Sequence, residues 1–320
     1  MGDNDSATSS SENNQSERSG GGTSCGKIDH TNFLSDNMGV LFGNPNLSDV
    51  TFMVNGELFP AHKAVLVARS EYFRAMFFGG LKECEEAEVV LKENNGHAFR
   101  ILLRYIYTAK LSLCELEENQ VLDFLGIANK YGFSKLQNSI ADYLKEIANV
   151  KNVCAILSTS QTYCIDDLVE HCLHVADRNA SEVLTTQGFL QLPIFEVTQL
   201  VSRDSFFAPE INIFRAIQNW VQAHPEMKDS AVELLMKHLH LSQISRRDLL
   251  KIVWPSGLLA LDVVLGAIEA QDDAELMLIK KSTEELEKEG NVEEGQKEEN
   301  GGDAGEGHGG EGGEVHGEGN

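Results

Sequence analysis

Residues 48–77 read SDVTFMVNGELFPAHKAVLVARSEYFRAMF, and this stretch decides the fold of the first half of the chain. Val50, Phe52 and Val54 alternate along it, which is typical of a strand with one buried face. Asn55-Gly56 follows directly and suits a two-residue turn, because both residues tolerate a positive φ. The stretch therefore predicts a β-hairpin within residues 49–60.

Helices are expected on both sides of one further strand. Between residues 61 and 78 apolar residues recur at helical spacing, and Ser70 can cap the second of two short helices. Glu88-Val-Val-Leu91 then predicts a short strand, and Asn95 opens a helix with one apolar face. From Glu117 onward the pattern is purely helical. The expected fold class is an α+β domain followed by an all-α helical domain.

The composition and the net charge of the chain disfavour some classes of binding partner. The 320 residues are 42% apolar, which is enough for two modest cores. A formal net charge of −24 repels phosphate backbones and anionic lipid, so we expect neither nucleic acid nor membrane as partner. No apolar run approaches the roughly 20 residues that span a bilayer, and the amino-terminal residues lack the apolar stretch of a signal peptide. A cytoplasmic location is expected, with the nucleus also open.

Both ends of the chain are compositionally biased. Residues 1–27 are rich in Ser, Asn and Gly, and residues 283–320 hold 13 acidic residues, 2 basic residues and 12 glycines. Such segments have little apolar surface to offset chain entropy, so we expect disorder at both ends, with the folded region closing near Ile279. The expected domains are residues 28–148 and 149–272, followed at 273–320 by a helical extension and then a disordered acidic tail.

The motifs resemble a known pair of domains. Residues 48–77, together with 103–108 (LRYIYT) and 125–133 (LGIANKYGF), resemble a BTB (POZ) domain. The second half resembles a BACK domain through Asp177–Ala180, Gly188–Leu192, Arg203–Phe206 and Glu210–Trp220. Ile28-Asp-His30, Gly79-Gly80 and Pro255–Leu259 are similar to one BTB-BACK subfamily, which continues into discoidin-type domains. The resemblance implies a protein–protein interaction module, not an enzyme: a homodimer that recruits clients to a cullin-3 RING ubiquitin ligase.

The resemblance also implies a contact with cullin-3. Leu81-Lys82-Glu83 is an apolar-x-acidic triplet just past Gly79-Gly80, and it matches the family's cullin-3 motif. The alternative is a helix-terminal Leu81 packed on its own domain beside a solvated Glu83. A leucine that enters an interface contributes roughly 1.5–3 kcal/mol, whereas an exposed ion pair contributes about 0–1 kcal/mol. Leu81 should therefore dominate the contact.

A dimer interface is implied on the first helix, at about residues 31–42. Its apolar side chains recur at helical spacing and exceed what one small core needs: Phe33, Leu34, Met38, Leu41 and Phe42. The alternative is a helix packed on its own monomer. Asp49 and Lys63 match the charged pair that the family places near its dimer interface, although both residue types are also common as plain surface groups. Dimers with related BTB proteins are a further expectation.

No catalytic, cofactor or metal motif is expected. Residues 21–27 (GGTSCGK) have P-loop spacing, but Ile28 stands where a Ser or Thr should bind magnesium, and no buried strand precedes the loop. Zinc ligands could be imagined among Cys154, Cys164, His171, Cys172 and His174, but no CxxC or HExxH spacing occurs. The six cysteines are expected to be reduced thiols that act as small apolar groups.

The carboxyl end departs from the family pattern. Relatives usually continue into a kelch propeller or discoidin-type domains, and no such domain is expected here. Three functions therefore compete: a cullin-3 adaptor that recruits unknown clients through the second domain or the tail, a dimerising scaffold or dominant-negative partner of longer relatives, and a transcriptional corepressor. The last is disfavoured, because no basic DNA-binding segment accompanies the BTB region.

Overall fold

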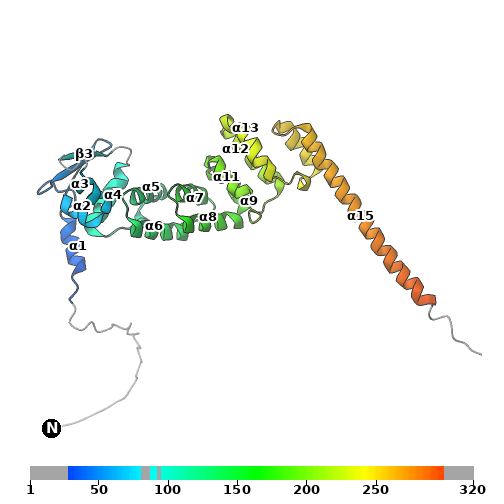
Figure 1. The fold of residues 1–320 in the computed structure, drawn as a ribbon, viewed down its shortest axis with the longest axis horizontal. Coiled ribbons are helices and arrows are strands. Elements are labelled where there is room, and N and C mark those ends of the chain that lie inside the picture. Colours follow the sequence, from blue (N-terminus) through cyan, green and yellow to red (C-terminus); the bar gives the residue numbers. More distant parts are fainter. Residues whose placement is uncertain (1–27, 81–86, 92–94, 299–320) are drawn as a thin grey trace, which may run out of the picture. The chain divides into compact units, whose positions relative to one another are not determined.

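The computed structural model describes residues 28–80, 87–91 and 95–298, with backbone alone for residues 285–298. The chain forms two compact units, Met1–Gln137 and Asn138–Asn320 (Figure 1). The boundary between them falls within α6 (Ser134–Ile147).

Unit 1 is a small sheet with helices, as the sequence predicts. Its elements before α6 are α1 (Thr31–Gly39), β1 (Val50–Val54), β2 (Glu57–Ala61), α2 (Lys63–Arg69), α3 (Glu71–Phe78), β3 (Glu88–Leu91), α4 (Gly96–Thr108), η2 (Leu113–Glu115) and α5 (Glu118–Lys130). β1 pairs antiparallel with β2 and parallel with β3, so the strand order is β2-β1-β3. Asn55 and Gly56 have φ of 50° and 81°, which confirms the predicted two-residue turn.

Helix starts in unit 1 follow their predicted caps. The Ser70 hydroxyl accepts a hydrogen bond from the Phe73 amide at 3.4 Å, and the Asn95 side chain accepts from His97 at 3.0 Å. Such caps satisfy amide groups that have no carbonyl partner within the helix. They fix where α3 and α4 begin, and hence where the apolar faces of both helices meet the sheet.

The core of unit 1 is aromatic. The Phe52 ring, from β1, lies 5.6 Å from Phe73 and 5.5 Å from Phe99, measured between ring centroids. Tyr131, which follows α5, stacks on Phe73 at 5.2 Å. All four residues are fully buried. Offset and edge-to-face ring pairs of this kind add to the free energy already gained by burying their area. One cluster thus ties β1, α3, α4 and the end of α5 together.

Unit 2 is helical throughout its described residues. Its helices after α6 are α7 (Val153–Thr162), α8 (Asp166–Arg178), α9 (Ala180–Val183), α10 (Gln187–Gln191), α11 (Ile194–Val201), α12 (Glu210–Ala223), η3 (Pro225–Met227), α13 (Lys228–Leu235), η4 (Met236–His238), η5 (Leu241–Gln243), α14 (Arg246–Asp248), η6 (Leu249–Val253, a π-helix), η7 (Trp254–Ser256) and α15 (Leu261–Glu298). Pro193 and Pro209 directly precede α11 and α12.

The apolar side of α12 lies in the core of unit 2. Phe214, Ile217, Trp220 and Val221 are all buried. The indole nitrogen of Trp220 donates to the Leu192 carbonyl oxygen at 2.8 Å, which satisfies the one polar atom of this side chain. Both the burial and the hydrogen bond hold α12 against the end of α10.

An ion pair joins two of the stretches that carry the BACK resemblance. Arg203 donates through Nη2 and Nε to the two oxygens of Asp177, at 2.7 and 3.2 Å. Burial raises the pKa of Asp177, but hydrogen bonds from Arg203 and Ser205 outweigh it, so that the pKa lies below its ordinary value. The two-pronged geometry of a guanidinium suits a carboxylate. The pair fixes the segment after α11 against the end of α8.

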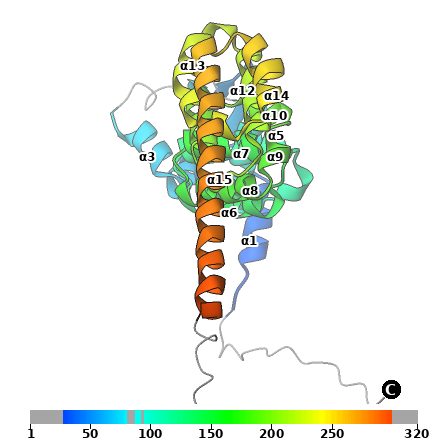
Figure 2. The ribbon, with the colours of Figure 1, turned by 90° about the vertical axis from the view of Figure 1, so that its right-hand side faces the viewer.

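α15 runs further than the sequence predicts. Figure 2 shows it as one uninterrupted helix, and it ends at Glu298, not near Ile279. Residues 284–289 consist of Glu, Lys and Leu, which are good helix formers. The sequence-based prediction missed this because it used the glycine content of residues 283–320 as a whole. Within the described ranges, no helix combines the length and the apolar character needed to span a membrane.

Candidate protein-interaction surface

α1 presents apolar side chains without burying any of its residues in unit 1. Phe33 and Leu34 are 70% and 61% exposed. Met38, Leu41 and Phe42 are half-buried, and the Phe42 ring lies 6.3 Å from that of Tyr107 on α4. The five residues proposed for a dimer contact therefore divide into an outer pair and an inner three that rest on their own domain. The side chain of Val40, which the periodicity did not single out, is also exposed.

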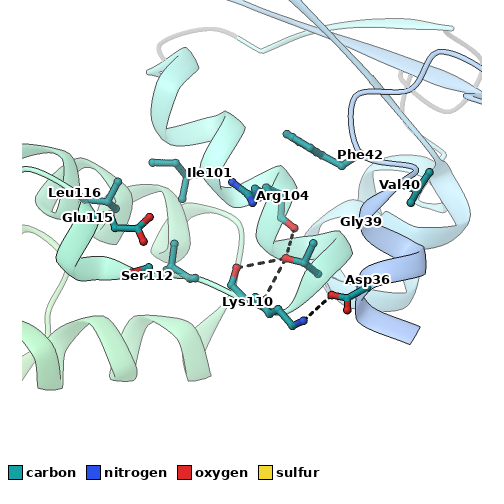
Figure 3. Close-up of a pocket in the computed structure, with 12 residues that line it drawn as sticks. Asp36, Gly39, Val40, Phe42, Ile101, Arg104, Lys110, Ser112, Glu115 and Leu116 are labelled. Carbon is teal, nitrogen blue, oxygen red and sulfur yellow. Dashed lines mark hydrogen bonds and ion pairs between the residues drawn. The ribbon is translucent and has the colours of Figure 1, made fainter. Parts of the chain in front are cut away.

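Polar contacts hold α1 against the end of α4. The Ser35 hydroxyl donates to the Thr108 carbonyl oxygen, and Lys110 Nζ pairs with Asp36 Oδ1 at 2.7 Å. Between α1 and residues 101–116 lies a groove of about 680 Å³, and Figure 3 shows Arg104 and Glu115 along its walls. No local sequence pattern predicts this groove, because it depends on how α1 packs on α4.

Asp49 contacts the Lys63 backbone at the start of α2, and the expectation that both residues lie near a dimer interface stays a prediction. Asp49 Oδ1 accepts a hydrogen bond from the Lys63 backbone amide at 2.7 Å, and Lys63 Nζ lies 5.1 Å from the centre of the Phe77 ring. Asp49 thus caps α2 from outside the helix, where a carboxylate also favours the positive end of the helix dipole. The contact gives Asp49 a structural role, whatever its part in a dimer.

A buried hydroxyl lies beside this cap. Tyr107 Oη accepts a hydrogen bond from the His62 backbone amide at 2.9 Å and lies 2.7 Å from His62 Nδ1. Burial, with a smaller contribution from the Asp49 carboxylate, raises the pKa of Tyr107 to about 12. The phenol therefore stays protonated and neutral, and it links α4 to the residue that precedes α2.

Leu81 and Glu83, the proposed cullin contact, lie outside the described residues. The residues immediately before them are described. Phe78, at the end of α3, is 75% exposed. Gly80 has φ of 76°, a conformation that suits glycine. Phe78 is a candidate contact that the sequence pattern did not separate from the buried Phe77.

Two of the three cysteines of unit 2 behave as buried apolar groups. Cys154 and Cys172 are buried, and burial raises the pKa of their thiols to about 11 and about 12. Cys164 is exposed. In the described part of the chain, no three His, Cys, Asp or Glu side chains lie close enough together to hold a metal ion. The P-loop-like residues 21–27 fall outside that part.

Two domain families match the sequence. The BTB/POZ domain matches residues 38–148, and the BACK domain, described as BTB And C-terminal Kelch, matches residues 153–254. Both families are protein-interaction modules. The two matches follow one another along the chain in the order that the sequence motifs predict.

Three proteins with a BTB/POZ domain in their names are similar to this chain. BTB/POZ domain-containing protein 9 of Rattus norvegicus is 42% identical over 253 residues, and that of Drosophila melanogaster is 37% identical over 250 residues. BTB/POZ domain-containing protein 6 of Xenopus laevis is 31% identical over 194 residues. These alignments cover 79%, 78% and 59% of this chain. They cover 41%, 34% and 36% of the relatives, so the chain spans well under half of their length.

Proposed function

The chain belongs to the BTB/POZ–BACK family, and from that premise we propose that it is a dimeric adaptor that brings client proteins to a cullin-3 ubiquitin ligase. The proposal has two parts, self-association through α1 and a cullin contact at Leu81 and Glu83. We propose that the protein acts in the cytoplasm or the nucleus.

The exposed face of α1 is the observation that carries the proposal. An aromatic and a leucine side chain, Phe33 and Leu34, are mostly exposed on a helix that buries none of its own residues. Large apolar side chains of this kind are enriched at protein interfaces, where aromatic anchors contribute much of the binding free energy. A second copy that covers this face would remove both side chains from water.

Contacts of α1, and of Phe42 just after it, with the rest of unit 1 give that face a fixed shape. Ser35 and Asp36 bond to Thr108 and Lys110, and Phe42 rests on Tyr107. A surface that is already ordered loses less conformational entropy when it binds. The α1 face is therefore suited to a stable partner, and Asp49 and Lys63 would lie near the edge of the same contact.

Affinity purification of the tagged full chain tests the cullin contact. Leu81→Asp should remove cullin-3 from the purified material, because a carboxylate cannot replace a leucine in a dry interface. Leu58→Asp, which changes an exposed leucine on β2, is the matched control and should retain cullin-3. Cullin-3 recovered equally with Leu81→Asp would refute the contact. The chain would then fit the second function, a scaffold that pairs with longer relatives.

Light scattering at micromolar concentration tests the dimer separately. The wild-type chain and Leu81→Asp should both give a dimer mass, whereas Phe33→Asp combined with Leu34→Asp should give a monomer. Each buried side chain contributes roughly 1.5–3 kcal/mol, so the double change should weaken dimerisation by at least about a hundredfold. A wild-type monomer would contradict self-association through α1 and leave the cullin test unaffected.

A further inference from the structure

Hydrogen bonds and ion pairs hold the first part of α15 against the rest of unit 2. Gln271 Nε2 donates to the carbonyl oxygens of Ser242 and Ile244, at 2.8 and 2.7 Å. Arg246 then pairs with Asp272 and, at 3.2 Å, with Glu275. The last of these contacts along the helix is at Glu275.

Four apolar residues follow immediately. Leu276, Met277, Leu278 and Ile279 are 56%, 71%, 67% and 55% exposed. Single exposed apolar side chains are ordinary, but a run of four within a charged helix is unfavourable unless something covers it. Leu276 and Ile279 are three residues apart, so they lie on the same side of α15 and form a candidate binding surface.

Charges of opposite sign flank the run. Asp273 and Lys280 are seven residues apart, which is close to two helical turns, so both lie on the side of α15 that carries Leu276. Among the described residues neither forms an ion pair. Along this side of α15 an acidic residue, apolar residues and a basic residue therefore follow one another. The same side of a second, antiparallel copy presents these residues in the opposite order, so the two sides are complementary.

We propose that residues 273–280 pair with the same segment of a second copy, with the two helices antiparallel. Leu276 of each copy then packs against Ile279 of the other. Asp273 of each copy faces Lys280 of the other, and the two-fold symmetry makes this contact twice. At each end of the contact, an acidic side chain of one copy therefore faces a basic side chain of the other.

The acidic carboxyl end favours the antiparallel orientation. Residues 283–320 hold 13 acidic and 2 basic residues, a net charge of −11 in each copy. A parallel pair would bring two such segments side by side, and like charges at short range repel. An antiparallel pair directs them to opposite ends.

The pairing is an accessory contact. Four side chains cover less area than the roughly 800 Å² per partner of a standard interface, so the segment associates weakly by itself. It adds to the contact proposed at α1, and it does not depend on cullin binding. Its effect is therefore measured as a shift in a self-association constant.

Sedimentation equilibrium of the full chain tests the pairing in a background that carries Phe33→Asp and Leu34→Asp. Adding Leu276→Asp and Ile279→Asp should weaken the remaining self-association by roughly tenfold or more. Adding Phe195→Asp, on another exposed apolar residue of unit 2, should leave it unchanged. Equal association constants for the two variants would overturn the proposal. The comparison holds even if α1 is not the dimer contact, because both variants share one background.

A charge exchange tests the orientation. Lys280→Glu and Asp273→Lys each place like charges opposite one another in their own antiparallel pair, so each variant should associate more weakly than the wild type. Mixing the two restores both acid–base contacts and should tighten association beyond either variant alone. Single variants that associate as tightly as the wild type would overturn the antiparallel pairing, because a parallel pair already places Asp273 against Asp273 and Lys280 against Lys280. A mixture that associates no more tightly than its components would overturn the acid–base contacts. Far-UV circular dichroism checks that every variant keeps its helix content.

Discussion

The Tyr107 hydroxyl is a single buried group that joins two elements of unit 1. It accepts a hydrogen bond from the His62 amide, and Tyr107→Phe would leave that amide buried without its partner. A lost partner of this kind costs about 1–3 kcal/mol of unfolding free energy. Urea denaturation should show this loss.

Tyr105→Phe is the matched control on the same helix. It keeps the edge-to-face contact with Phe133, at 6.1 Å between ring centroids, so its unfolding free energy should change by less than about 0.5 kcal/mol. If both variants lost the same amount, the hydrogen bond to His62 would have no special weight in the stability of unit 1.

Glu196 predicts a pH dependence of stability in unit 2. Its side chain is buried, Ser158 Oγ donates to Oε1 at 3.1 Å, and Oε2 has no hydrogen-bond partner among the described residues. Burial raises the pKa of Glu196 above its ordinary 4.5, which the Ser158 hydrogen bond only partly offsets. The folded state therefore holds the proton more tightly than the unfolded state. Stability from this group is complete below pH 4.5 and falls as pH rises through the raised folded pKa.

Glu196→Gln should remove this loss, because a neutral amide keeps the same shape. Urea denaturation of both proteins from about pH 4 to about pH 8 should show the variant gaining stability over the wild type as pH rises. Two stability curves that stay parallel across this range would show that Glu196 keeps an ordinary pKa in the fold.

At the scale of one element, Gly79 ends α3. A Cβ added there would overlap the Ala75 carbonyl oxygen, so the backbone would have to move. Gly79→Ala should lower the unfolding free energy by about 1–3 kcal/mol, measured by urea denaturation. Gly266→Ala, where an added Cβ meets nothing, should be neutral or stabilising. A neutral Gly79→Ala would mean that α3 can end without its glycine.

From the sequence, individual strands, turns and helix caps could be predicted better than the pairing of the strands in the sheet. The hairpin at Asn55-Gly56, the strand at Glu88–Leu91 and the caps at Ser70 and Asn95 depend on neighbouring residues, and the structure confirms each of them. The parallel pairing of β1 with β3 brings together residues more than thirty positions apart, so local patterns could not predict it. The groove beside α1 was missed for the same reason.

Exposure was harder to predict than helix formation. The apolar spacing of α1 and α12 is similar, yet α12 buries Phe214 and Trp220 while α1 leaves Phe33 and Leu34 exposed. Periodicity identifies an apolar face but not what covers it. Only the resemblance favoured a dimer contact for α1 over packing on its own domain, and that contact stays a prediction.

At the scale of the whole molecule, net charge should oppose self-association. Each copy carries a formal charge of −24, so a dimer brings two strongly acidic chains together. Salt screens this repulsion, and the Debye length falls from about 30 Å at 0.01 M to about 8 Å at 0.15 M. Sedimentation equilibrium should therefore show tighter dimers at the higher ionic strength. Weaker dimers there would mean that attractive contacts across the interface outweigh the overall repulsion.

Because α15 is attached to the rest of unit 2 at Gln271 and Glu275, a small rotation there displaces the far end of the helix by a larger distance. The 23 residues from Leu276 to Glu298 extend about 35 Å at 1.5 Å per residue. A tilt of ~10° at the attachment would therefore move the far end by ~6 Å. The contacts of Arg246 with Asp272 and Glu275 therefore help to set the direction in which residues 276–298 extend from unit 2.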